Sequence, residues 1–154
     1  MKTFALVLAV ASLGNAQDAR SHTILFVCEH GSAKSVIATT HFNRIAEQRR
    51  LPYRAISRGI HPDSEIPPNI KNGLAADGFR INIAMPTLIS AGDIRGAERI
   101  VTLSCELPKT IQVDKAKFVE WRDLPAVSDG YPDARSAIVA KIEELVATLT
   151  KAKR

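Results

Sequence analysis

The stretch ILFVCEHGSAKSVIA (residues 24–38) predicts the centre of the fold, because an apolar strand, a short loop and a helix follow one another in it. The strand is the nearly unbroken apolar run from His22 to Cys28, rich in branched residues, which is typical of strands that a parallel sheet buries on both faces. Five residues separate Cys28 from Lys34 and Ser35, which open the helix. A thiol therefore stands at the carboxyl end of a strand, close to a cation.

Helical and strand patterns alternate along the rest of the chain. The expected elements, in order, are a helix from Lys34 that ends before Pro52, a strand at 53–57, a helix from Pro67 and Pro68 to a cap at Gly78, strands at 98–104 and 117–121, and a last helix carrying Ile138, Ile142, Leu145 and Leu149. The segment 79–96 is ambiguous: Pro86 divides it, and a short helix fits near Ser90 to Ile94. This alternation predicts an α/β fold, with a parallel sheet between two layers of helices.

Length, composition and charge limit the kinds of protein that this chain can be. A chain of 154 residues, 45% hydrophobic and 24% charged, suits one globular domain. The net charge of +5 favours anionic partners, but the charges are scattered and only 5% of residues are aromatic, so nucleic-acid binding is not expected. Two cysteines, Cys28 and Cys105, are too few and too far apart for a zinc cluster or a disulfide-framed fold. No metal site and no cofactor are expected.

The N-terminus has the pattern of a secretory signal. Residues 1–16, MKTFALVLAVASLGNA, contain a lysine, an apolar stretch and small residues before Gln17. We expect residues 1–16 to be removed, 17–21 to form a short linker and 22–152 to form the domain, in an exported protein that is periplasmic or secreted. The alternative is that the apolar stretch is a strand or helix of the fold. No later segment has the pattern of a membrane span.

The junction at Cys28 has the chemistry of an oxyanion site. Amide groups of a loop that enters a helix converge, the helix N-terminus adds positive potential, and such surroundings lower the pKa of a thiol. Lys34 would neutralise the anion, and Ser35 could donate a hydrogen bond to the sulfur. Glu29 would oppose an anion and His30, when protonated, would offset it; alternatively, both side chains point to solvent. The residues expected around the oxyanion are Glu29, His30, Gly31, Ser32, Ala33 and Lys34.

Several motifs together resemble one family. The pattern C-x5-[RK]-S after the first strand, the Ser-x-Gly turn in SRGIHP (57–62) and the tryptophan and aspartate of EWRDLP (120–125) are similar to those of low-molecular-weight protein tyrosine phosphatases and the related thioredoxin-coupled arsenate reductases, the phosphotyrosine protein phosphatase I superfamily. The resemblance implies a three-layer α/β/α fold with a four-stranded parallel sheet in the order 2-1-3-4, and a phosphate-binding loop after the first strand.

The resemblance also implies roles for single residues. Cys28 would attack phosphorus to form a phosphocysteine, and Asp123 would protonate the leaving oxygen, with Asp129 as the second choice. Asp123 could instead be a solvated turn residue. Lys34 replaces the family's usual arginine, so the charge is kept and the planar two-point grip on phosphate is lost. Gly31 replaces an asparagine often found in this loop.

Three functions stay open at this point. The first is a phosphatase acting on a phosphorylated small molecule or protein, which could include phosphotyrosine. The second is an arsenate reductase in which Cys28 binds arsenate and Cys105 closes a disulfide that an external thiol reduces; there is no third cysteine for a longer relay. Cys105 could also be a small buried core residue. The third is an oxyanion-binding protein without catalysis, because Lys34 stands in place of arginine.

Overall fold

The predicted first strand lies inside the sheet. The computed structural model describes residues 21–80 and 85–152, so the expected signal segment 1–16 and residues 17–20 of the linker lie outside it. Within it, β1 (His22–Cys28) has β2 and β3 as its two neighbours in a four-stranded sheet of order β2-β1-β3-β4. All three strand pairs are parallel. The predicted α/β class and strand order are confirmed.

The remaining elements follow the predicted alternation closely. In chain order they are α1 (Lys34–Gln48), β2 (Tyr53–Gly59), α2 (Pro68–Ala76), α3 (Ala91–Gly96), β3 (Ala97–Leu103), β4 (Phe118–Trp121), the 3₁₀ turn η2 (Val127–Asp129) and α4 (Tyr131–Lys151). The ambiguous segment 79–96 contains α3, which Ser90 and Asp93 start with a reciprocal pair of side-chain caps. No helix in the described residues is long and apolar enough to cross a membrane.

Gly78 ends α2 as its position predicts. Its φ of 78° is left-handed, a conformation that glycine adopts without steric cost. The N–H of Gly78 donates to the carbonyl of Ala75, and the N–H of Phe79 donates to the carbonyl of Leu74. These two bonds satisfy the last carbonyls of the helix in the arrangement known as a Schellman motif.

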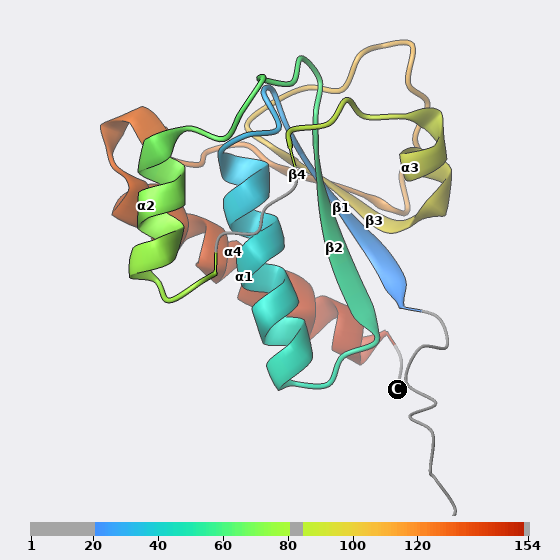
Figure 1. The fold of residues 1–154 in the computed structure, drawn as a ribbon. Coiled ribbons are helices and arrows are strands. Elements are labelled where there is room, and N and C mark those ends of the chain that lie inside the picture. Colours follow the sequence, from blue (N-terminus) through green and yellow to red (C-terminus); the bar gives the residue numbers. More distant parts are fainter. Residues whose placement is uncertain (1–20, 81–84, 153–154) are drawn as a thin grey trace, which may run out of the picture.

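Helices cover the two faces of the sheet unequally (Figure 1). Helices α1, α2 and α4 pack on one face, where Phe26, Phe42 and Ile142 are fully buried in the larger core. On the other face, Leu25 and Val27 pack against Ile94 of the short helix α3 and against partly buried residues of the loop that follows β3. Successive β1 residues thus enter opposite cores, as expected for an inner strand.

A side chain covers the middle of the edge strand β2. Asn43 of α1 accepts a hydrogen bond from the N–H of Ala55 at 2.7 Å and donates one to the carbonyl of Ala55 at 3.1 Å. Further along, Gly59 forms an isolated parallel bridge with Leu88. The outward-facing backbone groups of β2 are therefore hydrogen-bonded at Ala55 and at Gly59, where no neighbouring strand is present.

Candidate active site

Cys28 lies where β1 ends and the loop to α1 begins, with Gly59 of β2 beside it in register. The residue is 6% exposed and Ser35, in the first turn of α1, is fully buried. The Cys28 Sγ and Ser35 Oγ atoms are 3.0 Å apart, which is hydrogen-bond distance. The strand end, the helix start and the Cys28–Ser35 contact agree with the sequence-based expectation. An ionised sulfur at this place would accept the hydroxyl proton of Ser35.

The loop after Cys28 is held from outside by the segment that follows β2. The carbonyl of Glu29 accepts hydrogen bonds from the N–H groups of Ile60 (2.9 Å) and His61 (2.8 Å), and the carbonyl of His30 accepts from the N–H of Asp63 (3.0 Å). In a trans peptide the next N–H points opposite to the carbonyl. The N–H groups of His30 and Gly31 therefore face away from residues 60–63, toward the concave side of the loop, as an oxyanion cradle requires.

Two glycines allow this contact between the segments. Gly31 has a φ of 61°, and a Cβ built on it would lie 2.7 Å from the backbone nitrogen of Gly59. A Cβ built on Gly59 would lie 2.8 Å from the nitrogen of Gly31. Since real Cβ atoms do not approach backbone that closely, a side chain at either position would push the loop away from β2.

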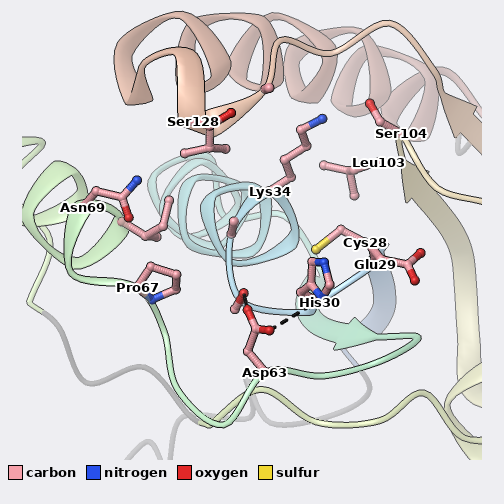
Figure 2. Close-up of a pocket in the computed structure, with 15 residues that line it drawn as sticks. Cys28, Glu29, His30, Lys34, Asp63, Pro67, Asn69, Leu103, Ser104 and Ser128 are labelled. Atoms are coloured by element: carbon pink, nitrogen blue, oxygen red, sulfur yellow. Dashed lines mark hydrogen bonds and ion pairs between the residues drawn. The ribbon is translucent and has the colours of Figure 1, made fainter.

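The loop borders a cavity of about 390 Å³ with Cys28 among its walls (Figure 2). The lining residues come from the loop and α1, from the segment before and at the start of α2, from the end of β3 and from the turn before α4. They are Cys28, Glu29, His30, Ser32, Ala33, Lys34, Asp63, Pro67, Asn69, Ile70, Leu103, Ser104, Ala126, Val127 and Ser128. Within the described residues, no group of three or more His, Cys, Asp or Glu side chains could hold a metal ion.

Lys34 connects the cradle to the loop after β4. Its Nζ donates a hydrogen bond to the carbonyl of Leu124 at 3.2 Å. Burial removes water from the ammonium and lowers the pKa of Lys34 below its usual value, while the sulfurs of Cys28 and Cys105 act in the opposite direction. Figure 2 shows the side chain extending along the cavity wall away from Asp63. One of its three donors is thus used by the protein, and the others remain for an oxyanion.

Two histidine–carboxylate pairs flank the loop. His61 Nδ1 lies 2.7 Å from Glu29 Oε1, and His30 Nδ1 lies 3.5 Å from Asp63 Oδ1. The sequence suggested that His30 offsets the charge of Glu29, but His61 is the histidine that pairs with Glu29. The reason is the backbone bonding of residues 60–63 to the loop, which a local sequence pattern does not encode.

The structure does not bring the expected acid to the cavity. Neither Asp123 nor Asp129, the aspartates that the resemblance favours, lines it. Asp123 is exposed in a neighbouring hollow that it shares with Cys105 and Trp121. The physical reason lies in the next residue: Leu124 packs against the larger core and its carbonyl faces Lys34, which leaves Asp123 on the outside of the turn.

Cys105 lies just beyond β3 and its thiol is bonded inward. Its Sγ donates to the carbonyl of Val27, the residue before Cys28, at 3.4 Å. Burial, with a smaller effect from Cys28, raises the pKa of Cys105 to about 11. Both cysteines are free thiols. The second thiol is therefore near the first and protonated at neutral pH.

A model of the low molecular weight phosphotyrosine protein phosphatase family matches residues 23–153. The chain belongs to this family. No curated protein matches the sequence at a significant level. The match covers the cradle, the cavity and Cys105, so the residues described above belong to the family domain.

Solved structures with the same fold include both phosphatases and arsenate reductases. YfkJ from Bacillus subtilis matches with a TM-score of 0.77 and 17% identity, covering 88% of this chain and 99% of YfkJ. A low molecular weight phosphotyrosine phosphatase from Vibrio cholerae O395, VcLMWPTP-2, matches with a TM-score of 0.73 and 15% identity, covering 85% and 98%. The thioredoxin-dependent arsenate reductase Cg_ArsC1' of Corynebacterium glutamicum matches with a TM-score of 0.71 and 22% identity, covering 88% of this chain but only 64% of that reductase.

Some residues that line the cavity could not be predicted from the local sequence. Asp63, Asn69, Ser104 and Ser128 line the cavity, and none of them stands in the Cys28 loop. Asp63 and Ser104 carry an available signal, because each comes after the end of a strand that pairs with β1. Parallel strands end at the same edge of a sheet, so residues just after them gather there.

Proposed function

We propose that this chain is a phosphatase that hydrolyses phosphomonoesters through a phosphocysteine on Cys28. The supporting observation is the cradle: a nearly buried sulfur 3.0 Å from the Ser35 hydroxyl, in a loop whose carbonyls of Glu29 and His30 are bonded outward. Inward amides stabilise the charge on the equatorial oxygens of a transferring phosphoryl group. Lys34 adds a positive charge at the start of α1.

The reaction takes two steps. The Cys28 thiolate attacks phosphorus, the S–P bond forms as the P–O bond to the leaving group breaks, and the leaving oxygen takes up a proton. Water then attacks phosphorus, loses a proton, and breaks the S–P bond, which releases phosphate and restores the thiolate. The Ser35 hydroxyl stabilises the sulfur anion when it departs in the second step.

Turnover of p-nitrophenyl phosphate tests this function. We expect hydrolysis by the wild type and a loss of at least about a thousandfold in Cys28→Ser, because a serine hydroxyl is a far weaker nucleophile than a thiolate. Denaturation of the wild type during turnover should trap a phosphorylated Cys28 peptide that mass spectrometry detects. A Cys28→Ser protein of undiminished activity would contradict the proposal, as would tight phosphate binding by calorimetry without any turnover, which fits a binding protein.

The walls of the cavity favour small or aliphatic phosphomonoesters over phosphotyrosine. Pro67, Ile70, Leu103 and Val127 supply apolar surface, and no Phe, Tyr or Trp is among the lining residues in the described parts of the chain. An aromatic leaving group would therefore find no large aromatic side chain to stack on. Comparing kcat/KM for an alkyl phosphate and for a phosphotyrosine peptide tests this preference.

A second candidate is arsenate reduction, and it is favoured because the hydrogen bond from Cys105 to the Val27 carbonyl places the second thiol beside the residue that precedes Cys28. In this scheme Cys28 displaces water from arsenate to form an S–As bond, and Cys105 attacks Cys28, releasing arsenite and leaving a disulfide. Two thiols supply the two electrons, and an external dithiol restores them. Arsenate-dependent oxidation of a supplied thiol, lost in Cys105→Ala, would support this reading. Phosphatase activity retained in Cys105→Ala would support the first.

We also propose that residues 1–16 direct export to the periplasm or the medium. The charged, apolar and small-residue regions of the segment support this, by their order and length. Expression of the full chain with intact-mass analysis of the exported fraction tests it: the expected N-terminus is Gln17, and Val7→Arg should block export by charging the apolar region. An unprocessed chain found only inside the cells would contradict the proposal.

A further inference from the structure

Asp63 places a carboxyl group in the wall of the Cys28 cavity. It reaches the cavity from the segment between β2 and α2, where its N–H bonds to the carbonyl of His30. The side chain is 42% exposed, so it is open to a molecule that enters the cavity. In Figure 2 it lies on the wall opposite Lys34 and Ser128.

The two oxygens of Asp63 have different surroundings. Oδ2 accepts a hydrogen bond from the Ser32 hydroxyl at 2.5 Å. Oδ1 lies 3.5 Å from His30 Nδ1, but that nitrogen donates its hydrogen bond to the carbonyl of His61 at 3.3 Å. Ser32 thus fixes the orientation of the carboxyl group, while Oδ1 forms no hydrogen bond with another described residue and can carry a transferable proton.

The other carboxyl groups near the cavity are less suited to proton transfer. Glu29 lines the cavity, but its Oε1 is bound by His61 at 2.7 Å. Asp123 and Asp129 lie outside the cavity walls. Asp63 is therefore the lining carboxyl group that the Cys28 loop orients through Ser32, and its second oxygen has only the 3.5 Å ion-pair contact with His30.

We propose that Asp63 is the catalytic acid and base of the phosphatase reaction. This inference rests on the proposed function. In the first step the Asp63 carboxyl group gives its proton to the leaving oxygen as the P–O bond breaks, and becomes a carboxylate. In the second step that carboxylate takes a proton from the attacking water as the S–P bond breaks, which restores the acid.

The test compares Asp63→Asn with Glu65→Gln, which removes a charge from an exposed residue of the same segment outside the cavity. Two substrates are used: p-nitrophenyl phosphate, whose leaving group departs readily without a proton, and an alkyl phosphate, whose leaving group needs one. Asp63→Asn should lower kcat/KM for the alkyl phosphate about 10²-fold to 10³-fold and for p-nitrophenyl phosphate by less than about tenfold. Phosphocysteine should accumulate in Asp63→Asn and not in Glu65→Gln.

The Ser32→Ala variant distinguishes a catalytic role of Asp63 from a role in supporting the loop. It removes the hydrogen bond from Ser32 to Asp63 and leaves the carboxyl group in place. If Ser32→Ala and Asp63→Asn each lower kcat/KM equally for the two substrates, Asp63 acts only by holding the loop and the inference is wrong. Equal losses on both substrates in Asp63→Asn, or a selective loss in Asp123→Asn instead, would also overturn it. Asp63→Ser, which keeps a polar side chain at this position, serves for the same comparison if Asp63→Asn does not fold.

Failure of this inference is distinguishable from failure of the proposed function. If Cys28→Ser retains wild-type activity, the phosphocysteine route itself is wrong. If Cys28→Ser is inactive while Asp63→Asn behaves as Glu65→Gln on both substrates, the route stands and only the role of Asp63 is refuted.

Discussion

The two thiols of the domain have different hydrogen-bond roles at the residue scale. Cys28 faces the Ser35 hydroxyl beside the start of α1, a place where a sulfur anion is stabilised. Cys105 uses its own proton to bond the carbonyl of Val27 and is half-buried. A thiol that donates its proton is a poor nucleophile, because the thiolate is the reactive form.

The raised pKa of Cys105 predicts its reactivity with iodoacetamide. In a Cys28→Ser background, Cys105 is the remaining thiol of the chain. Burial, the main cause of the raised pKa of Cys105, stays in this variant, while the smaller effect of Cys28 is lost. The thiolate fraction, and so the alkylation rate, should therefore rise about tenfold per pH unit from pH 7.5 to beyond pH 9. Alkylation followed by mass spectrometry measures this rate. The urea-unfolded chain is the control, and a plateau near pH 9 in the folded protein would contradict the burial argument.

The positions of site residues were predictable where the contact is local. Cys28 and Ser35 lie seven positions apart, so a strand, a short loop and a helix start suffice to bring them together. Asp63 depends on pairing between the segment after β2 and the Cys28 loop, which separates the partners by more than thirty residues. Asp123 is turned outward by the packing of Leu124, a preference set by the core and not by the local pattern.

At the element scale, the close approach of the Cys28 loop to the end of β2 determines the shape of the cradle. Carbonyls of the loop bond to the amides of residues 60, 61 and 63, and Gly31 and Gly59 lie almost in backbone contact. The loop is therefore held by contacts with the protein itself, from the end of β2 as well as from β1.

Gly31→Ala should destabilise the protein by about 2 kcal/mol or more. Its left-handed φ disfavours any side chain, and the new Cβ would meet the nitrogen of Gly59. Urea unfolding measures the change in free energy. Gly96→Ala is the matched control: a Cβ there meets nothing within 4 Å, so we expect a change within about 0.5 kcal/mol. Equal effects of the two substitutions would show that the contact has no energetic importance.

Most elements were predictable because their patterns are long or their boundaries are marked. Branched runs mark β1 and β3, and the spacing of buried residues marks α4. Helix α3 has only six residues, too short for periodicity to show, and its caps at Ser90 and Asp93 are the signal that identifies it. The short strand β4 was found from its apolar character alone.

At the scale of the whole molecule, one carboxylate joins the three helices that cover the larger core. Asp77, at the end of α2, accepts a hydrogen bond from the Tyr131 hydroxyl of α4 at 2.6 Å. Its Oδ2 also lies 3.3 Å from His41 Nε2 of α1 and 3.5 Å from Arg135 Nε of α4. Burial, together with Asp77, raises the pKa of Tyr131 and keeps its hydroxyl a donor. The cluster holds α2, and with it part of the cavity wall, against α1 and α4.

Tyr131→Phe should lower the free energy of unfolding by about 1.5 kcal/mol, because it removes one donor from a partly buried carboxylate. Chemical unfolding measures this loss. Ser136→Ala, which removes a hydroxyl from an exposed position of the same helix, should change stability by less than about 0.5 kcal/mol. A neutral Tyr131→Phe would mean that His41 and Arg135 satisfy Asp77 without it.

The Asn43 side chain protects the edge strand β2 from pairing with another chain at high protein concentration. An open strand at the border of a sheet invites another chain to pair with it, which leads to aggregation. Here the Asn43 amide occupies both backbone groups of Ala55, and Leu88 pairs with Gly59, so an incoming strand would have to displace them. The opposite border, β4, has only four residues. Both edges of the sheet thus resist strand pairing with another copy of the chain, which lowers the tendency of the protein to aggregate.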